Sequence, residues 1–254
     1  MTWQEFSAPS DPAASAPRLA ALRALMTAEG LDAVIVPRAD AWQGEYVADA
    51  DARLRWLTGF SGSAGFAIVT GSQAGVFIDG RYRVQVRSQI DLGHFTPVPW
   101  PETRPSAWLA EALPQGGRVG FDPWLHTRKE IAGMEGALTD TGIALIALDH
   151  NPVDAIWPDR PAPPVGPARI HPDAIAGESA AQKRARLATD LKAQGQAAAL
   201  LTLPDSISWL LNIRGSDLPK NPVVQSFAVL SDSGDLALFA DPAKFDADLR
   251  AHLG

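Results

Sequence analysis

The same succession of sequence patterns occurs twice in this chain, and this repeat constrains the fold more than any other feature. Each copy opens with an amphipathic helical pattern that ends at a glycine, at residues 18–30 and 178–195. A short apolar stretch typical of a buried strand follows, at residues 32–37 and 197–203. The copies stay about 150 to 165 residues apart, so we interpret the chain as a duplicated α/β unit. Two unrelated α/β openings are the alternative, because helix, strand and hairpin commonly follow one another.

The correspondence continues through a tryptophan-containing stretch and a predicted hairpin. RWLTGFSGSA, which begins at Arg55, matches SWLLNIRGSD, which begins at Ser208, with Trp56 and Trp209 in the same place. FAIVT and GVFID predict a hairpin in the first copy and match FAVLS and LALFAD in the second. The first copy then continues with alternating patterns, which predict helices near 82–90, 105–113 and 127–138 and strands near 95–98, 118–122 and 143–148.

The second copy, in contrast, ends shortly after Asp241. Either this copy is smaller or the chain stops part-way through a longer protein, and we favour the second, because a sheet without its covering helices exposes apolar surface and a free edge. Between the copies, NPVDAIWPDRPAPPVGPARIHP is rich in proline, which predicts a semi-rigid, extended linker. The predicted organisation is a flexible tail at 1–17, a first domain at 18–150, a linker at 151–172 and an incomplete second domain at 173–254.

Composition and charge argue against several classes of function. The net charge of −7 provides no basic field for phosphates, so we expect no nucleic-acid partner and no membrane-surface role. The tightest basic group, Lys183, Arg184 and Arg186, is interpreted as the solvated face of a helix. The lack of cysteine excludes disulfides and thiol nucleophiles, and it fits a reducing cytoplasm. The N-terminus has no signal-peptide pattern, and no apolar run reaches the ~18 residues of a membrane helix.

The stretch TGFSGSAGFAIVTGSQAGVFIDGRY, from Thr58 to Tyr82, contains glycines at spacing three among serines. It fails each catalytic template. A dinucleotide fingerprint needs G-x-G-x-x-G before a helix, a phosphate loop needs Gly-Lys-Ser/Thr, and a nucleophile elbow needs G-x-S-x-G. We interpret the glycines as a tight turn in which two backbone segments pass closely before a hairpin, and we assign the serines no role.

Histidines and carboxylates give no sign of a metal site. The chain has five histidines, and none forms H-E-x-x-H or a pair at spacing three or four. The stretch DADAR, from Asp49 to Arg53, lacks the further acidic residues and the distal glutamate of a calcium loop. We expect surface or loop positions for the histidines and no metal bound by this chain.

Arg81, in the stretch DGRY, is a candidate binding residue. An Asp-Gly pair after a strand turns the chain sharply, and Arg81 then projects from the edge where α/β sheets often place ligand groups. A guanidinium there can bind a carboxylate or a carbonyl, and the alternative is a structural salt bridge or an arginine at the start of a helix. In the loop of the second copy, Arg214 and Asp217 are further candidates for contact with substrate, with an internal Arg–Asp pair as the alternative.

Three motifs together resemble one family. DAWQGEYVADADARLRWLTGFSGSAGFAIVT and the following GVFIDGRY resemble the N-terminal domain of Xaa-Pro aminopeptidases of the three-domain type. NPVDAIWPDRP resembles the linker of that family, and SISWLLNIRGSDLPKNPVVQSFAVL resembles the opening of its second domain. The resemblance runs from about Arg18 to Asp241 in the right order. It implies an α/β fold with two tandem domains of the creatinase/prolidase N-terminal type, each a mixed β-sheet flanked by helices.

The resemblance also implies a third, catalytic domain that would begin beyond Gly254. In the family this domain holds two divalent metal ions, usually manganese, and a metal-bound hydroxide attacks the peptide bond before proline. Nothing in this chain matches those metal ligands, so we expect no catalytic residue here and no peptidase activity of the chain alone. The arginine of the family's GRY motif helps bind substrate and matches Arg81. For Arg214 and Asp217, a place beside the substrate channel is our own inference.

The leading hypothesis is the non-catalytic, substrate-capping part of a cytoplasmic Xaa-Pro aminopeptidase that acts on short peptides with proline at the second position. Its partners would be the missing catalytic domain and, because the family typically dimerises through that domain, a second copy. One alternative is a stand-alone peptide-binding or dimerisation module without peptidase activity. Another is a prolidase or creatinase, and the duplication argues against it because those proteins usually carry one N-terminal domain.

Overall fold

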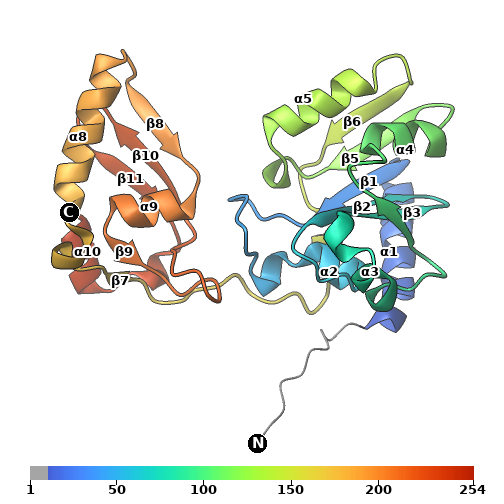
Figure 1. Ribbon diagram of the computed structural model, residues 1–254, viewed down its shortest axis with the longest axis horizontal. Helices are drawn as coiled ribbons and strands as arrows, with labels where there is room; N and C mark the ends of the chain where they lie inside the picture. The colour runs from blue at the N-terminus through green and yellow to red at the C-terminus, as the bar shows by residue number, and fades with distance from the viewer. Residues whose placement is uncertain (1–10) are drawn as a thin grey trace, which may run out of the picture. The chain divides into compact units, whose positions relative to one another are not determined.

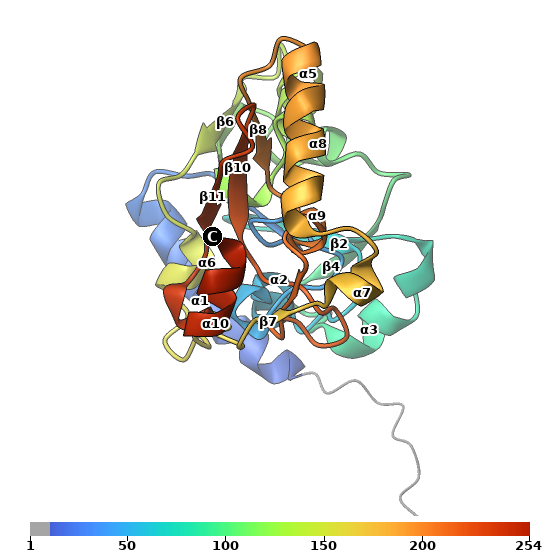
Figure 2. The same cartoon turned by 90° about the vertical axis from the view of Figure 1, so that its left-hand side faces the viewer.

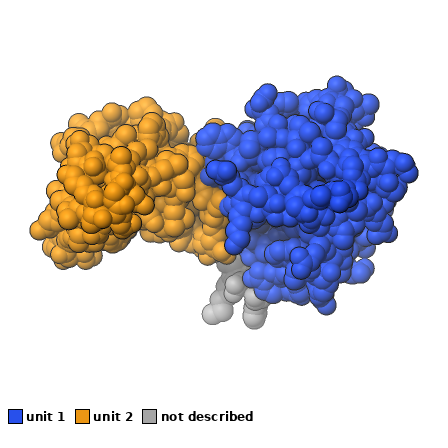
Figure 3. Space-filling view, turned by 90° about the horizontal axis from the view of Figure 1, so that it is seen from above, with its two compact units in different colours: residues 1–41, 51–161 blue, residues 42–50, 162–254 orange. Residues whose placement is uncertain are grey.

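The structure of the protein, a computed structural model, describes residues 11–254 and forms two compact units (Figure 1). Unit 1 comprises the chain up to Ala41 together with Asp51–Pro161, and unit 2 comprises Trp42–Ala50 together with Ala162–Gly254 (Figure 3). In residues 11–254 no helix is long and apolar enough to cross a membrane.

Unit 1 is built on a six-stranded mixed sheet in the order β4-β3-β2-β1-β5-β6. β1, β2 and β3 pair antiparallel, whereas β4, β5 and β6 join the sheet in parallel. The mixed sheet expected for the first domain is therefore confirmed. The strands span Ala33–Pro37 (β1), Gly65–Thr70 (β2), Ala74–Ile78 (β3), Thr96–Pro99 (β4), Gly117–Phe121 (β5) and Ile143–Ala147 (β6).

Helices cover both faces of this sheet, as the alternating pattern predicts. One face packs against apolar residues of α1, α2, α3 and α6. The other face, which includes Ile35, Ile68 and Phe77, packs against α4 and α5. The helices span Ser15–Ala28 (α1), Arg53–Thr58 (α2), Gln85–Gln89 (α3), Pro105–Ala112 (α4), Arg128–Ala137 (α5) and Pro152–Ala155 (α6), with 3-10 turns at Pro12–Ala14 (η1), Asp49–Asp51 (η2), Gly80–Tyr82 (η3) and Pro123–Leu125 (η4).

Unit 2 contains a three-stranded antiparallel sheet in the order β11-β10-β8 and a two-stranded sheet of β7 and β9. Figure 2 shows α8 lying along the larger sheet, where Leu191 of α8 and Leu230 of β10 share one apolar cluster. The segment 42–50 adds Ala48, which packs with Leu218 and Val223. The elements span Arg169–Ile170 (β7), Asp173–Ala176 (α7), Ala180–Ala193 (α8), Ala198–Leu201 (β8), Pro204–Leu210 (α9), Ile213–Arg214 (β9), Phe227–Ser231 (β10), Leu236–Phe239 (β11), Pro242–Lys244 (η5) and Ala247–Leu253 (α10).

The repeat inferred from the sequence is present in the strand pairing. In unit 1 the middle strand β2 pairs antiparallel with both β1 and β3, and in unit 2 the middle strand β10 pairs antiparallel with both β8 and β11. The register also agrees, because Ala33 pairs with Thr70 in the first copy and Ala198 pairs with Ser231 in the second. Helix α1 precedes β1 in the chain as α8 precedes β8. The chain therefore carries two copies of one helix–strand–helix–hairpin unit.

The first helix begins earlier than the sequence predicts. Residues 1–10 of the predicted tail lie outside the described residues, but η1 and the start of α1 are helical rather than loose. Asp11 caps η1 by accepting a hydrogen bond from Ala14 N. Pro17 lies in the first turn of α1, where a backbone donor is not needed. The prediction of a flexible tail is therefore wrong for residues 12–17.

The proline-rich segment 151–172 contains a short helix near its start and a short strand near its end. Asn151 caps α6, and Pro152 occupies the first position of this helix, where proline is favoured. Val153 and Trp157 are buried in the core of unit 1. At the other end, Ala168 is buried in unit 2 and β7 pairs with β9. The prediction of an extended linker is therefore wrong at the first end, where Pro152–Ala155 is helical, whereas β7 at the other end is extended but paired within unit 2.

Candidate binding site at the end of β3

The end of β3 places an arginine on the surface of unit 1. Asp79 follows the strand and caps η3, because its Oδ1 accepts a hydrogen bond from the backbone N of Arg81 at 2.8 Å. The same carboxylate binds the Arg81 guanidinium, with Nη2 2.5 Å and Nε 2.9 Å from Oδ2. The Arg81 side chain nevertheless remains 65% exposed. The guanidinium is therefore anchored at one side and accessible to solvent.

The Asp79–Arg81 pair is the salt bridge that the sequence analysis gave as an alternative. It orients the Arg81 guanidinium and adds little to the stability of the protein. Hydrogen bonds from Arg81 lower the pKa of Asp79, so the carboxylate stays charged at neutral pH. An exposed ion pair contributes only about 0–1 kcal/mol to stability. Its main effect is to restrict the guanidinium, whose carbon also lies 5.2 Å from the centre of the Tyr82 ring. A guanidinium ordered in advance binds a carboxylate or carbonyl at a lower entropic cost.

Two serines fasten the glycine stretch to the segment that follows Arg81. The Tyr82 hydroxyl accepts a hydrogen bond from Ser63 N at 3.1 Å and lies 2.6 Å from Ser63 Oγ. Gln89 accepts a hydrogen bond from Ser61 N at 3.0 Å and donates one to Ser61 Oγ at 2.8 Å. The interpretation that the serines have no role is therefore wrong. No local pattern signals these contacts, because the partners are 19 and 28 residues away in the chain.

The glycines of this stretch form a tight turn, as the sequence predicts. A Cβ at Gly62 would lie 2.2 Å from the Phe60 ring, and a Cβ at Gly65 would lie 2.7 Å from the Phe77 carbonyl oxygen. Gly59 ends α2 at a φ of 84°, in the left-handed region that favours glycine. The stretch therefore holds the end of the hairpin in place and carries no phosphate loop.

Unit 2 repeats this arrangement without the arginine. Asp241 caps η5 after β11, as Asp79 caps η3 after β3. Ala243 then occupies the position that Arg81 has in unit 1. The short helix forms in both places, so the architecture does not require an arginine there.

Asp217 and Arg214, the two candidates in the second loop, have different environments. The Asp217 side chain is fully buried, and its Oδ2 accepts hydrogen bonds from Lys244 Nζ and from Gln225 N, both at 2.7 Å. Arg214 is partly exposed and donates to the carbonyl of Ile213 at 2.8 Å. Within the described residues Asp217 pairs with Lys244, which the sequence analysis did not identify, and not with Arg214. The Asp217 Oδ1 atom is buried without a hydrogen-bond partner in the described residues, and a contact with substrate stays a prediction for both Arg214 and Asp217.

A cation from the first helix of each copy binds the matched tryptophan. Arg18 donates to the Trp56 carbonyl at 2.6 Å and lies 4.6 Å above its ring. Lys183 donates to the Trp209 carbonyl at 2.7 Å and lies 4.4 Å above its ring. Lys183 is 2% exposed, and burial lowers its pKa, so the interpretation as a solvated face is wrong for this residue. Arg18 and Lys183 occupy corresponding positions in the two copies, and this correspondence in the sequence could have identified them as a structural pair.

No metal centre is visible in residues 11–254, where no three His, Asp or Glu side chains converge to hold an ion. His94 and His150 are exposed, as expected. His126 lies in a loop but is partly buried, with its ring packed edge-on against Phe121 at 5.8 Å. Burial lowers the pKa of His126 below its ordinary value of 6.5.

Comparison with known proteins gives a consistent result for both units. A family model described as the creatinase/prolidase N-terminal domain matches residues 18–153, and a second model of the same description matches residues 159–254. A probable Xaa-Pro aminopeptidase P of Neosartorya fischeri is 39% identical over 240 residues, which are 93% of this chain and 36% of the relative. The protein of that name from Coccidioides posadasii strain C735 is 37% identical over 252 residues, 98% of this chain and 39% of the relative.

Among solved structures, the X-prolyl aminopeptidase of Caenorhabditis elegans matches with a TM-score of 0.88 and 33% identity. The match covers 94% of this chain and 40% of that protein, which is described as a cytosolic enzyme with a di-nuclear active site. The chain thus spans well under half the length of the relatives it matches, and its likeness to them extends over both units.

Proposed function

The chain belongs to the creatinase/prolidase N-terminal domain family, and on this premise we propose that it is the non-catalytic N-terminal region of an Xaa-Pro aminopeptidase. Such an enzyme removes the residue that precedes a proline at position two of a peptide. In this proposal the two units cap the active site and Arg81 binds the substrate. Support comes from the likeness to relatives of that name over nearly the whole chain.

The observation that carries the proposal for Arg81 is its position in the repeat. Its side chain is 65% exposed and is oriented by Asp79. Its counterpart Ala243 follows the same capping aspartate in a helix that forms equally well. The short helix does not require this exposed charged side chain, and a short peptide offers carbonyl and carboxylate groups that suit a guanidinium.

The metal chemistry of the proposed enzyme does not fit the residues of this chain. The C. elegans relative is described as having a di-nuclear active site, whereas the described residues contain no group of three His, Asp or Glu that could hold an ion. We propose that two divalent ions, manganese by the family resemblance, are held by a catalytic domain outside these 254 residues. The chain alone would then have no peptidase activity.

The partners and the location follow from the same proposal. The catalytic domain and a second copy of the enzyme are the proposed protein partners, and short peptides with proline at position two are the proposed substrates. A cytoplasmic location is supported by the C. elegans relative, which is described as cytosolic.

The role of Arg81 is tested with Arg81→Ala in the longer enzyme and Arg128→Ala as a matched control, because Arg128 is an exposed arginine on α5 of the same unit. The loss of a charged hydrogen-bond partner should lower kcat/KM toward a Xaa-Pro peptide by a factor of about 10 to 150, equivalent to about 1.5–3 kcal/mol. The melting temperature should stay the same, because exposed ion pairs contribute little to stability. An unchanged kcat/KM in Arg81→Ala would remove the arginine from the proposal.

The proposal that peptidase activity requires the catalytic domain is tested by assaying the 254-residue chain and the longer enzyme with manganese on the same peptide. We expect activity only in the longer enzyme. Activity in the short chain would contradict the proposal. Inactivity of both, with saturable peptide binding by the short chain, would favour the stand-alone binding module.

A further inference from the structure

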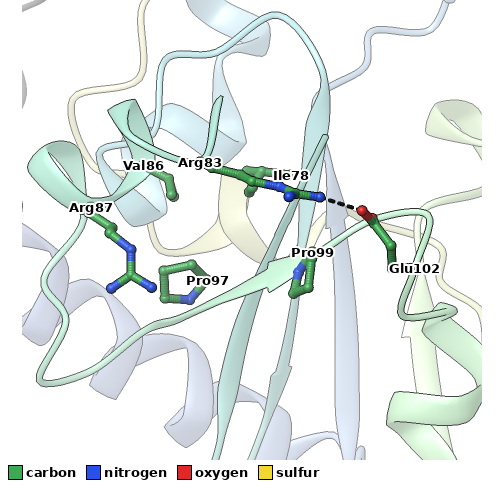
Figure 4. Close-up of a pocket in the computed structure, with 7 residues that line it drawn as sticks. All are labelled: Ile78, Arg83, Val86, Arg87, Pro97, Pro99 and Glu102. Carbon is green, nitrogen blue, oxygen red and sulfur yellow. Dashed lines mark hydrogen bonds and ion pairs between the residues drawn. The ribbon is translucent and has the colours of Figure 1, made fainter. Parts of the chain in front are cut away.

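We propose that unit 1 has a second binding site, separate from Arg81, for a carboxylate carried on a small apolar group. The site is a cleft beside α3 and the edge strand β4, with a volume of about 420 Å³ (Figure 4). Natural pockets for small molecules occupy about 300–1,000 Å³. The residues that line this β4 cleft are Ile78, Arg83, Val86, Arg87, Pro97, Pro99 and Glu102.

The walls of the β4 cleft combine apolar and charged side chains. Pro97 and Pro99 lie on β4, which ends the sheet and pairs with β3 on one side only. A proline contributes a ring and no backbone N–H, so this edge offers apolar surface with few donors. Ile78 of β3 and Val86 of α3 also line the cleft, but they are 2% and 0% exposed, so the two prolines provide most of its apolar surface. An apolar group can therefore pack against the proline rings, and the charged side chains of the cleft are left for a charged head group.

The charges in the β4 cleft are unbalanced in favour of cations. Arg83 and Glu102 form an ion pair, and both side chains are more than half exposed, at 57% and 55%. Arg87 lies near Pro97 at the other end of the cleft (Figure 4). Arg87 is exposed to solvent, and within the described residues it forms no ion pair with a carboxylate. Two guanidinium groups thus face one carboxylate, in a chain whose net charge is −7.

Glu102 indicates which anion this arrangement accepts. Its carboxylate already binds one of the two guanidinium groups, so the cleft is compatible with a second carboxylate on the other. The excess of one positive charge suits a monoanion. A dianionic phosphate would leave uncompensated negative charge close to Glu102. The apolar walls then favour an aliphatic body, such as that of a small fatty acid or of the C-terminal residue of a peptide.

The proposal is tested by calorimetric titration of the 254-residue chain with N-acetyl-L-leucine and with its uncharged C-terminal amide. Saturable binding of the acid and none of the amide is expected. Arg87→Gln should weaken binding by about tenfold or more, because a charged hydrogen bond is lost. Arg128→Gln, at the exposed arginine on α5, is the matched control and should leave binding unchanged. Equal binding of acid and amide, or no effect of Arg87→Gln, would overturn the proposal.

A second variant distinguishes the β4 cleft from nonspecific attraction to surface arginines. Glu102→Gln frees Arg83 and removes a negative charge, so it should strengthen binding of the acid several-fold. Weaker binding in Glu102→Gln would contradict the assignment. The β4 cleft is read from binding to the 254-residue chain, whereas the peptidase role is read from kcat/KM of the longer enzyme, so failure of one leaves the other standing. Hexanoate and an acetylated tripeptide with a free C-terminus then distinguish the two sources of carboxylate by their relative affinities.

Discussion

The two units share a framework and differ in what they add to it. In both, a cation of the first helix lies over a tryptophan and binds its carbonyl, Arg18 in unit 1 and Lys183 in unit 2. In both, an aspartate after the hairpin caps a short helix. Only unit 1 places an exposed arginine, Arg81, on that helix. The repeat thus separates residues that the fold requires from a residue that it does not, and this difference makes Arg81 a functional candidate.

The sheets of the two units differ in how they are covered. Ile35 and Phe77 of unit 1 are 4% and 0% exposed, because α4 and α5 pack against their face. The residues at the same places in unit 2, Leu200 and Phe239, are 69% and 58% exposed. The same strand order therefore buries much more apolar surface in unit 1. We expect unit 1 to derive more of its stability from its sheet than unit 2 does.

The two units also differ in the contacts that hold the glycine-containing loop after α2 in unit 1 and after α9 in unit 2. This difference predicts the largest effect of a single substitution on stability. In unit 2 the buried pair of Lys244 and Asp217 holds the loop, whereas in unit 1 the hydroxyls of Tyr82 and Ser63 do so. Lys244→Met leaves the Asp217 carboxylate buried and uncompensated, which should cost about 3–5 kcal/mol of unfolding free energy. Tyr82→Phe removes neutral hydrogen bonds and should cost about 1 kcal/mol. Urea denaturation of both variants measures the contrast.

A double variant serves as the control for this comparison. Lys244→Met combined with Asp217→Leu removes both charges and should recover most of the stability that Lys244→Met loses, because a buried ion pair can be replaced by apolar groups at little cost. Equal losses of unfolding free energy in Lys244→Met and Tyr82→Phe would show that the Lys244–Asp217 pair is solvated and that the contacts in the two units contribute equally.

The difference in sheet coverage predicts the next largest effect. Ile35→Ala creates a cavity between the sheet and its covering helices, and it should cost about 2–5 kcal/mol. Leu200→Ala truncates the corresponding side chain on an exposed face of the 254-residue chain and should cost less than about 1 kcal/mol. The free energy of unfolding measured in urea tests both. A large loss in Leu200→Ala would show that this face is covered in solution.

Much of the fold could be predicted from the sequence because it rests on local patterns. The hairpins, the buried strands and the helix ends at glycine are set by apolar periodicity and turn residues within a few positions. The position of Arg81 after a strand could be predicted for the same reason. The start of α1 could not, because prolines near residues 12 and 17 indicate a loose segment unless they are placed in the first turn of a helix.

The remaining features depend on partners far apart in the chain. Ser63 finds Tyr82 only after the glycine turn brings the loop to η3. Lys244 and Asp217 are 27 residues apart, and nothing in the sequence pairs this lysine rather than Arg214 with the aspartate. Lys183 resembles a surface cation until the tryptophan carbonyl is placed beside it. The β4 cleft likewise forms from separate segments, so neither periodicity nor a motif could indicate it.

The smallest expected effect is a pH dependence that should appear in unit 1 and involve His126. Burial lowers the pKa of His126 in the folded protein below 6.5, and the nearby carboxylates of Glu130 and Asp122 only partly oppose this. Between the two pKa values, His126 is therefore protonated in the unfolded chain and neutral in the folded chain. This contribution to stability is complete above about pH 6.5 and is lost as the pH falls toward the folded pKa, at a slope of at most about 1.4 kcal/mol per pH unit.

Hydrogen exchange between pH 7 and 5 measures this effect separately in the two units. The amides of β5, which contains Phe121 beside His126, should lose protection on acidification more than those of β10 in unit 2. His126→Gln cannot take up the proton and should remove the extra loss in β5. His94→Gln, at an exposed histidine of the same unit, should keep it. Equal acid sensitivity of β5 in the wild-type chain and in His126→Gln would assign the pH response to other groups.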